Sequence, residues 1–69
     1  MTDYLVIYER TDTGWSAYVP DLPGCVTAGD TREETEAMAD EAVQLFLEDL
    51  RETSQPIPEP STEAGYVVA

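Results

Sequence analysis

Three short hydrophobic runs, separated by turn-forming residues, occupy the first part of the chain. The runs cover residues 4–9, 15–19 and 25–28 and are rich in β-branched and aromatic residues. Asp12-Thr13-Gly14 lies between the first two runs and supplies a glycine for a hairpin turn. Runs of this length and composition, bounded by turns, predict three strands that form an antiparallel meander.

Apolar residues then recur at helical spacing from about residue 32 to about residue 52. Thr31 and Glu34 have the spacing of a capping box, in which Thr31 caps the amide of Glu34 and the Glu34 side chain reaches back to the amide of Thr31. Asp49 falls near the middle of the apolar face, and we expect it to be solvated where the helix projects past the sheet. The predicted apolar face consists of Met38, Ala39, Ala42, Leu45, Phe46 and Leu50, with Val43 at its side.

Proline punctuates the chain after the predicted helix. Residues 53–63 contain alternating prolines, which favour an extended connector over a helix. The stretch G-Y-V-V-A at 65–69 follows and predicts a short fourth strand. Three strands, a helix and a strand predict an α+β fold in which one crossover helix covers one face of the sheet.

The corner between the second and third runs reads P-D-L-P-G and is unusually rich in residues that restrict the backbone. Pro20 ends the second strand because it cannot donate to a ladder, and Asp21 is expected to bind backbone amides ahead of it in an Asx-turn. Leu22, the apolar residue of the corner, is expected to close the end of the core. Pro23 and Gly24 suit the two central positions of a type II turn.

The composition describes a small and strongly acidic protein. The chain has 69 residues, which predicts a single domain over 1–69, with 15 Asp and Glu against three Arg and no Lys. A formal net charge of −12 argues against binding nucleic acid directly through phosphates. The charge has two possible meanings, a generally acidic surface or an acidic face that recruits a basic partner. A domain of this size has a thin core, so self-association or a partner protein is expected to add stability.

Catalytic and metal-binding chemistry has little support in the sequence. The chain has no histidine and a single cysteine, Cys25, which is expected to be a small core residue rather than a nucleophile. Neither a metal site nor a cofactor is predicted. The N-terminal stretch has no basic region of a signal peptide, and no apolar run is long enough to span a membrane, so a cytoplasmic location is expected.

Candidate partner-binding residues lie on the polar side of the predicted helix and on the second strand. Trp15 and Tyr18 lie on opposite sides of that strand, so only one of them can face the helix. The sheet face away from the helix could present Tyr4, Val6, Tyr8 and Tyr18 as a surface for self-association. The candidate helix acids, which could equally be no more than a solvated surface, are Glu36, Asp40, Glu41 and Glu48.

Three stretches together resemble the HicB family of bacterial and archaeal antitoxins. They are G-W-S-A-Y-V-P-D-L-P-G-C-V-T-A-G-D-T at 14–31, E-E-T-E-A-M-A-D-E-A at 33–42 and P-I-P-E-P-S at 56–61, and the resemblance extends over residues 4–68. The resemblance implies a truncated RNase H-like fold with strand order 3-2-1-4, in which the short fourth strand is parallel to the first. It also assigns the corner Pro20, Asp21, Leu22, Pro23, Gly24 and Cys25 to the signature of the family.

The resemblance further implies binding and neutralisation of a small basic HicA-like toxin, an mRNA endoribonuclease, by covering its surface. Longer family members carry a C-terminal DNA-binding domain; none follows in this sequence, so autoregulation by this chain alone is not expected. The first predicted strand has no acid in its interior and the fourth has none, so RNase H chemistry on two metal ions is not expected either. The alternative function is a stand-alone homo-oligomeric domain, a dimer or larger, with a structural or regulatory role.

Overall fold

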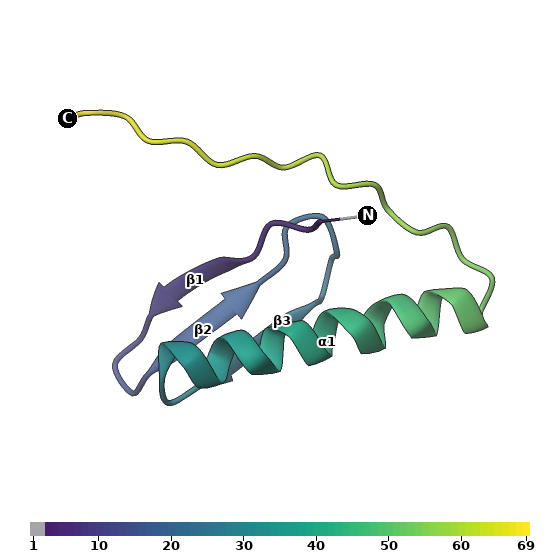
Figure 1. The fold of residues 1–69 in the computed structure, drawn as a ribbon, viewed down its shortest axis with the longest axis horizontal. Coiled ribbons are helices and arrows are strands. Elements are labelled where there is room, and N and C mark those ends of the chain that lie inside the picture. The colour runs from purple at the N-terminus through teal and green to yellow at the C-terminus, as the bar shows by residue number, and fades with distance from the viewer. Residues whose placement is uncertain (1–2) are drawn as a thin grey trace.

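A computed structural model describes residues 3–69 as a three-stranded sheet followed by one long helix (Figure 1). The strands are β1 (Ile7–Arg10), β2 (Trp15–Tyr18) and β3 (Val26–Gly29), and the helix is α1 (Arg32–Glu52). The α+β architecture and the helix bounds agree with the prediction from the sequence.

The first strand begins three residues later than predicted, at Ile7 rather than at residue 4. Its partner explains the difference. Ile7 pairs with Tyr18, the last residue of β2, and the chain turns at Pro20 soon afterwards. Residues 4–6 therefore have no ladder to join, although Tyr4 and Val6 still pack against the core.

The strands lie in the order β1-β2-β3, with both pairs antiparallel. Cross-strand partners share a face of the sheet, so Tyr8 lies on the same face as the buried Ala17. Ile7, Tyr18 and Val26 form a row on the opposite face. The prediction that Tyr4, Val6, Tyr8 and Tyr18 line one open face is therefore wrong. Tyr8 pairs with Ala17 rather than with Tyr18, and Tyr4 and Val6 pack against the buried core.

Helix α1 packs on the sheet through β2 and β3. The buried core cluster consists of Val19, Leu22, Cys25 and Leu47, and around it pack Tyr4, Val6, Ala42, Val43, Phe46 and Leu50. Leu22 is completely buried, at 0% exposure. The corner between β2 and β3 therefore closes one end of the core with its single apolar side chain.

The apolar face of α1 differs in part from the predicted one. Leu45 is 59% exposed and Met38 is also exposed, whereas Leu47 is buried in the core. The buried positions Thr35, Ala39 and Leu47 repeat at four and eight residues along the helix, so they share one face. Two residues correspond to a rotation of about 200° around a helix, so Leu45 points to the opposite side of α1 from Leu47. Asp49 is exposed, as predicted.

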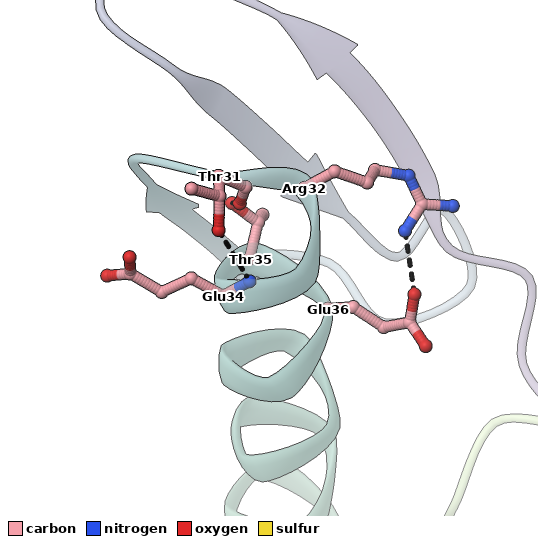
Figure 2. A network of polar contacts seen from close by, with 5 residues as sticks. All are labelled: Thr31, Arg32, Glu34, Thr35 and Glu36. Atoms are coloured by element: carbon pink, nitrogen blue, oxygen red, sulfur yellow. Dashed lines mark hydrogen bonds and ion pairs between the residues drawn. The ribbon is translucent and has the colours of Figure 1, made fainter.

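The start of α1 is held by a threonine cap against the end of β3 (Figure 2). The Thr31 hydroxyl accepts a hydrogen bond from the amide of Glu34 at 3.0 Å. The Glu34 side chain points away from Thr31 in Figure 2, so the cap consists of the threonine half of the predicted box. Thr35 is fully buried and donates its hydroxyl to the Thr31 carbonyl at 2.7 Å. A Cβ atom on Gly29 would lie 2.7 Å from the Thr35 hydroxyl, so only glycine permits this approach.

The helix ends in a Schellman motif. Gln55 donates its amide to the carbonyl of Leu50 at 2.8 Å, and Ser54 donates to Arg51 at 3.2 Å. Ser54 has a φ of +55°, the left-handed conformation that this motif requires and that glycine usually supplies. The chain then turns back along the domain as an extended connector, as the prolines predict (Figure 1).

The predicted fourth strand does not form in the structure of the single chain. No strand is assigned in the part of the described chain that follows α1. Tyr66, Val67 and Val68 are 104%, 93% and 100% exposed. These residues lie away from the unpaired edge of β1, so their backbone groups pair with no strand. The observed order of three strands agrees with the first part of the predicted order 3-2-1-4, and the fourth position is not filled.

The burial of Leu22 gives a direct test of the core. We expect Leu22→Ala to lower the free energy of unfolding by about 2–5 kcal/mol, because it leaves a cavity at a fully buried site. Leu45→Ala, which removes the same atoms from an exposed site on α1, should change it by less than about 0.5 kcal/mol. Urea unfolding followed by circular dichroism measures both.

Where the alanine variant is too unstable to fold, Leu22→Met keeps the volume and should cost less than about 1.5 kcal/mol. Equal losses for Leu22→Ala and Leu45→Ala would contradict the assigned core.

Candidate functional site

A groove lies between α1 and residues 3–8, which include the start of β1. The helix packs on β2 and β3, and this leaves the helix-facing side of β1 and of the residues before it uncovered. The groove has a volume of about 640 Å³. Its lining residues are Asp3, Tyr4, Val6, Tyr8, Glu33, Glu36, Ala37, Ala39, Asp40, Val43, Gln44 and Leu47.

The bottom of the groove is apolar. Tyr4, Val6 and Tyr8 alternate along the chain, so their side chains emerge on one face of the extended segment. Val43 and Leu47 lie one turn apart on α1 and face them from the other side. These five residues are called the groove floor below. They give the groove an aromatic and aliphatic surface of the kind that anchors a bound side chain.

Carboxylates surround this apolar floor. Asp3 comes from the N-terminal segment, and Glu33, Glu36 and Asp40 come from α1. The helix acids are three and four residues apart and therefore lie along one side of the helix. These four residues are called the groove rim below. Four acids around one concave surface produce a local negative potential that attracts cations.

One arginine crosses the rim and moderates its charge. The Arg32 guanidinium lies 3.7 Å from the centre of the Tyr8 ring. It also forms an ion pair with Glu36 at 2.7 Å (Figure 2). Both side chains of this pair are substantially exposed, so the pair contributes little stability. Arg32 is thus engaged by Tyr8 and Glu36, and Asp3, Glu33 and Asp40 are the rim acids that it does not pair with.

The structure separates the predicted partner-binding residues into different surfaces. Glu36 and Asp40 lie on the groove rim, whereas Glu41 and Glu48 are exposed and do not line the groove. Tyr18 is 40% exposed on the sheet face away from the helix. The rim residues Asp3 and Glu33 were not among the predicted ones. Glu33 lies three residues before Glu36, so helical spacing alone would have placed it on the same side of the helix as Glu36 and Asp40.

Trp15 lies apart from both the groove and the open face. It shares the helix-facing side of β2 with Ala17 and is half-buried at the start of the strand. The Arg10 guanidinium lies 5.1 Å from the centre of its ring. An aromatic ring covered by a cation in this way is already partly shielded from solvent, so Trp15 offers a smaller contact surface than its size suggests.

The corner between β2 and β3 consists of two consecutive turns. Leu22 donates its amide to the carbonyl of Val19, and Cys25 donates to Leu22, each at 3.0 Å. The second turn has Pro23 and Gly24 at its centre, and Gly24 has a φ of +87°. A type II turn requires this positive φ at its third residue. The two turns bring the start of β3 back beside β2 and place Leu22 in the core.

Asp21 binds the connector instead of the amides next to it in the chain. Its Oδ2 accepts hydrogen bonds from the amides of Ser61 and Thr62, each at 3.1 Å. Its Oδ1 accepts from the hydroxyls of Ser61 at 3.1 Å and Thr62 at 2.8 Å. The predicted Asx-turn is therefore not what this carboxylate does. An extended chain with free amides passes close to the corner and offers four donors, and we call this set of four hydrogen bonds the Asp21 anchor.

The donors of the anchor change the acidity of Asp21. The hydroxyl and the amide of Thr62, followed by the donors of Ser61, lower the pKa of the Asp21 carboxyl below its ordinary value of 3.8. A second contact supports the same segment, because the Tyr4 hydroxyl donates to the carbonyl of Pro58. The connector is thus attached to the domain at two successive places before residue 63.

Reactive and metal-binding groups are scarce in the part of the chain that the structure describes. Residues 3–69 contain no group of three or more His, Cys, Asp or Glu side chains placed to hold a metal ion. Cys25 is buried, and burial raises the pKa of its thiol, which keeps it protonated. Over the same residues, no helix has both the length and the apolar character needed to cross a membrane.

Comparison with known proteins gives a consistent result. A protein-family model described as HicB_like antitoxin of bacterial toxin-antitoxin system matches residues 4–68. The protein named Antitoxin HicB 2 of Photorhabdus laumondii is 44% identical over 69 residues; the match covers 94% of this chain and 47% of the relative, so the chain spans about half of its length. The UPF0150 protein ssr1765 of Synechocystis is 40% identical, with 81% of this chain and 72% of the relative covered.

A solved structure shares the fold at appreciable sequence identity. It is a HicA3 and HicB3 toxin-antitoxin complex, one chain of which aligns with a TM-score of 0.74 at 32% identity. The alignment covers 87% of this chain and 70% of the solved chain.

The Asp21 anchor predicts a pH-dependent connector. Because the pKa of Asp21 is lowered in the folded chain, the anchor is stabilised above pH 3.8 and is lost as the pH falls below that value through the folded-state pKa. We expect Asp21→Asn to release the connector at neutral pH, since an amide has one acceptor oxygen in place of two. Amide hydrogen exchange of Ser61 and Thr62, measured by NMR, should become several-fold faster.

The matched control is Asp12→Asn, which makes the same change of charge in the turn between β1 and β2 and should leave these amides unchanged. Unaltered exchange at residues 61–62 in Asp21→Asn would contradict the anchor.

Proposed function

Because the chain belongs to the HicB-like antitoxin family, we propose that it is a protein-binding antitoxin module of a type II toxin–antitoxin pair. Its partner is a small basic HicA-like mRNA endoribonuclease, which it neutralises by covering the surface that binds or cuts RNA. The observation that carries this proposal is the alignment with a chain of the HicA3 and HicB3 complex. Its role is binding rather than catalysis, within a single HicB-like domain that acts in the cytoplasm.

The charge of the chain supports a basic partner. A net charge of −12 with only three basic residues gives the domain a strong negative field. Such a field accelerates the encounter with a basic protein and repels acidic competitors, and it affects association rates more than final affinity. The same field opposes direct contact with RNA or DNA, so the proposal does not require this chain to touch nucleic acid.

The groove rim is the part of this acidic surface best suited to a specific contact. Glu33, Glu36 and Asp40 project from one side of a rigid helix, so their positions relative to one another are defined. Rigid carboxylates can pair with arginine or lysine side chains of the partner at little cost in conformational entropy of the backbone. The exposed acids Glu41 and Glu48 lie outside the groove and contribute only to the general field.

The proposed pairing is tested first by co-purification. The tagged chain, expressed from its native locus, should recover a small basic protein in equal amount, and expression of that protein alone should arrest growth and degrade mRNA. Co-expression of the chain should restore growth. Recovery of the chain without a basic partner would contradict the antitoxin function and favour the stand-alone oligomeric role.

The contribution of the rim is tested with two variants of equal charge change. Glu33→Gln/Asp40→Asn removes two rim carboxylates that are not paired with Arg32, and we expect the association rate with the toxin to fall about tenfold at low salt. Glu41→Gln/Glu48→Gln removes two acids outside the groove and should lower the rate by no more than about twofold. Stopped-flow or biosensor kinetics at several salt concentrations provides the measurement. Equal effects of the two variants would show that only the net charge matters.

A further inference from the structure

Tyr4 takes part in two features of the structure at once. Its side chain lines the groove and packs against the buried core cluster, so it belongs to the groove floor. Its hydroxyl donates a hydrogen bond to the carbonyl of Pro58 in the connector. The strand ladder begins at Ile7, so the contacts of the Tyr4 side chain determine where this residue lies. The position of the connector therefore affects the shape of the groove.

The connector is attached to the domain at Pro58 and again at the Asp21 anchor. Pro58 is half-buried, whereas the other residues of 53–69 are exposed. The anchor begins three residues later, where Ser61 and Thr62 donate four hydrogen bonds of 2.8 to 3.1 Å to the carboxylate. The connector runs back along the domain after α1 to reach both places (Figure 1). One short segment thus joins the groove floor to the corner between β2 and β3.

The segment between the two attachments is stiff. Pro58 and Pro60 have a fixed φ, and the residue before each of them, Ile57 and Glu59, is restricted to extended conformations by the proline that follows. Three residues of polyproline II helix span about 9 Å. A proline-rich segment acts as a semi-rigid spacer, whereas a flexible one would absorb a displacement at either end. If residues 61–62 leave Asp21, the Pro58 carbonyl must therefore move as well.

A stiff spacer also makes the two attachments cooperative. Formation of one contact holds the partners of the other close together, which raises their effective concentration. The coupling is reciprocal, because each contact stabilises the other by the same free energy. The Tyr4 hydroxyl and the Asp21 carboxylate therefore influence each other although they touch different residues of the connector.

We propose that Asp21 is a positioning residue for the groove floor. The anchor fixes residues 58–62, and these residues hold the Tyr4 side chain in the groove beside Val43 and Leu47. Asp21 itself does not line the groove, so its effect on the groove passes through the connector. The consequence for binding rests on the proposed function: a partner that uses the groove meets a floor that is already ordered and does not have to order Tyr4 on binding.

The first experiment tests the coupling in the chain alone. Tyr4→Phe removes the hydroxyl and keeps the ring, and we expect the amides of Ser61 and Thr62 to exchange about threefold to tenfold faster, the effect of one lost hydrogen bond. The matched control is Tyr18→Phe, which removes a tyrosine hydroxyl from the open face of the sheet and should leave both amides unchanged. Equal exchange in the two variants would overturn the proposal, and so would faster exchange that extends equally to the amides of β2, because that indicates general unfolding.

The second experiment measures the coupling in the opposite direction. Asp21→Asn should shift the NMR signals of the Tyr4 ring and of the Val43 methyl groups, which do not touch the anchor. Asp12→Asn makes the same change of charge in the turn between β1 and β2 and should not shift them. Unshifted Tyr4 and Val43 signals in Asp21→Asn, together with faster exchange at residues 61–62, would show that the anchor opens without moving the floor and would refute the positioning role.

The third experiment removes the stiffness of the spacer. Pro60→Gly keeps the Pro58 carbonyl and the donors of Ser61 and Thr62, but it allows the segment between them to bend. In this background, Tyr4→Phe should accelerate exchange at residues 61–62 by less than about twofold, because a flexible segment lowers the effective concentration. A coupling as large as in the unmutated spacer would show that the connector does not transmit it.

Binding of the toxin provides the last test. We expect the complex of Asp21→Asn to dissociate about threefold to tenfold faster than that of Asp12→Asn, which loses the same charge away from the connector. Equal dissociation rates, for a toxin that the unmutated chain binds, would overturn the role of Asp21 in binding and leave the proposed function intact. A chain that binds no toxin would refute the proposed function, and the exchange measurements still decide whether Asp21 positions Tyr4.

Discussion

The contact between the end of β3 and the start of α1 determines most of this structure. Gly29 has no side chain, and the buried Thr35 packs against its backbone while donating its hydroxyl to Thr31. This close approach fixes where the helix begins and over which strands it lies. Because α1 is held against β3 and β2, it cannot also cover β1. The groove beside β1 is thus a consequence of how the helix starts, and the same helix supplies part of its apolar floor and most of its acidic rim.

Local signals in the sequence were reliable wherever a residue acts on its near neighbours. Thr31 as the helix cap, the helix bounds and the turn at Pro23-Gly24 all depend on interactions within four residues of the chain. The placement of Leu47 and Leu45 was not predicted, because both are leucines on one helix and only the position of the sheet decides which is buried. The burial of Thr35 was not predicted, because a hydrophobic pattern does not include a polar residue. Thr35 can be buried because its hydroxyl donates a hydrogen bond to the Thr31 carbonyl.

Long-range contacts account for the remaining differences, and they include the candidate site. Asp21 was expected to act on its neighbours, whereas its four donors come from residues 40 and 41 positions away. No pattern near Asp21 indicates that choice. The groove also depends on long-range contacts, since its floor combines the N-terminal segment with the middle of α1. It exists because α1 packs on β2 and β3 rather than on β1. The rim acids could be recognised as one side of a helix from spacing alone, but not as the border of a groove.

The rigid corner and the connector that follows α1 are joined through the Asp21 anchor. The two turns of the corner hold Asp21 in a fixed place by burying the adjacent Leu22. A carboxylate fixed in this way can orient the connector, and the prolines of the connector limit the directions in which it can continue. The restricted backbone at residues 20–24 therefore does more than join two strands. It also sets the position at which residues 61–62 are held against the domain, 40 residues further along the chain.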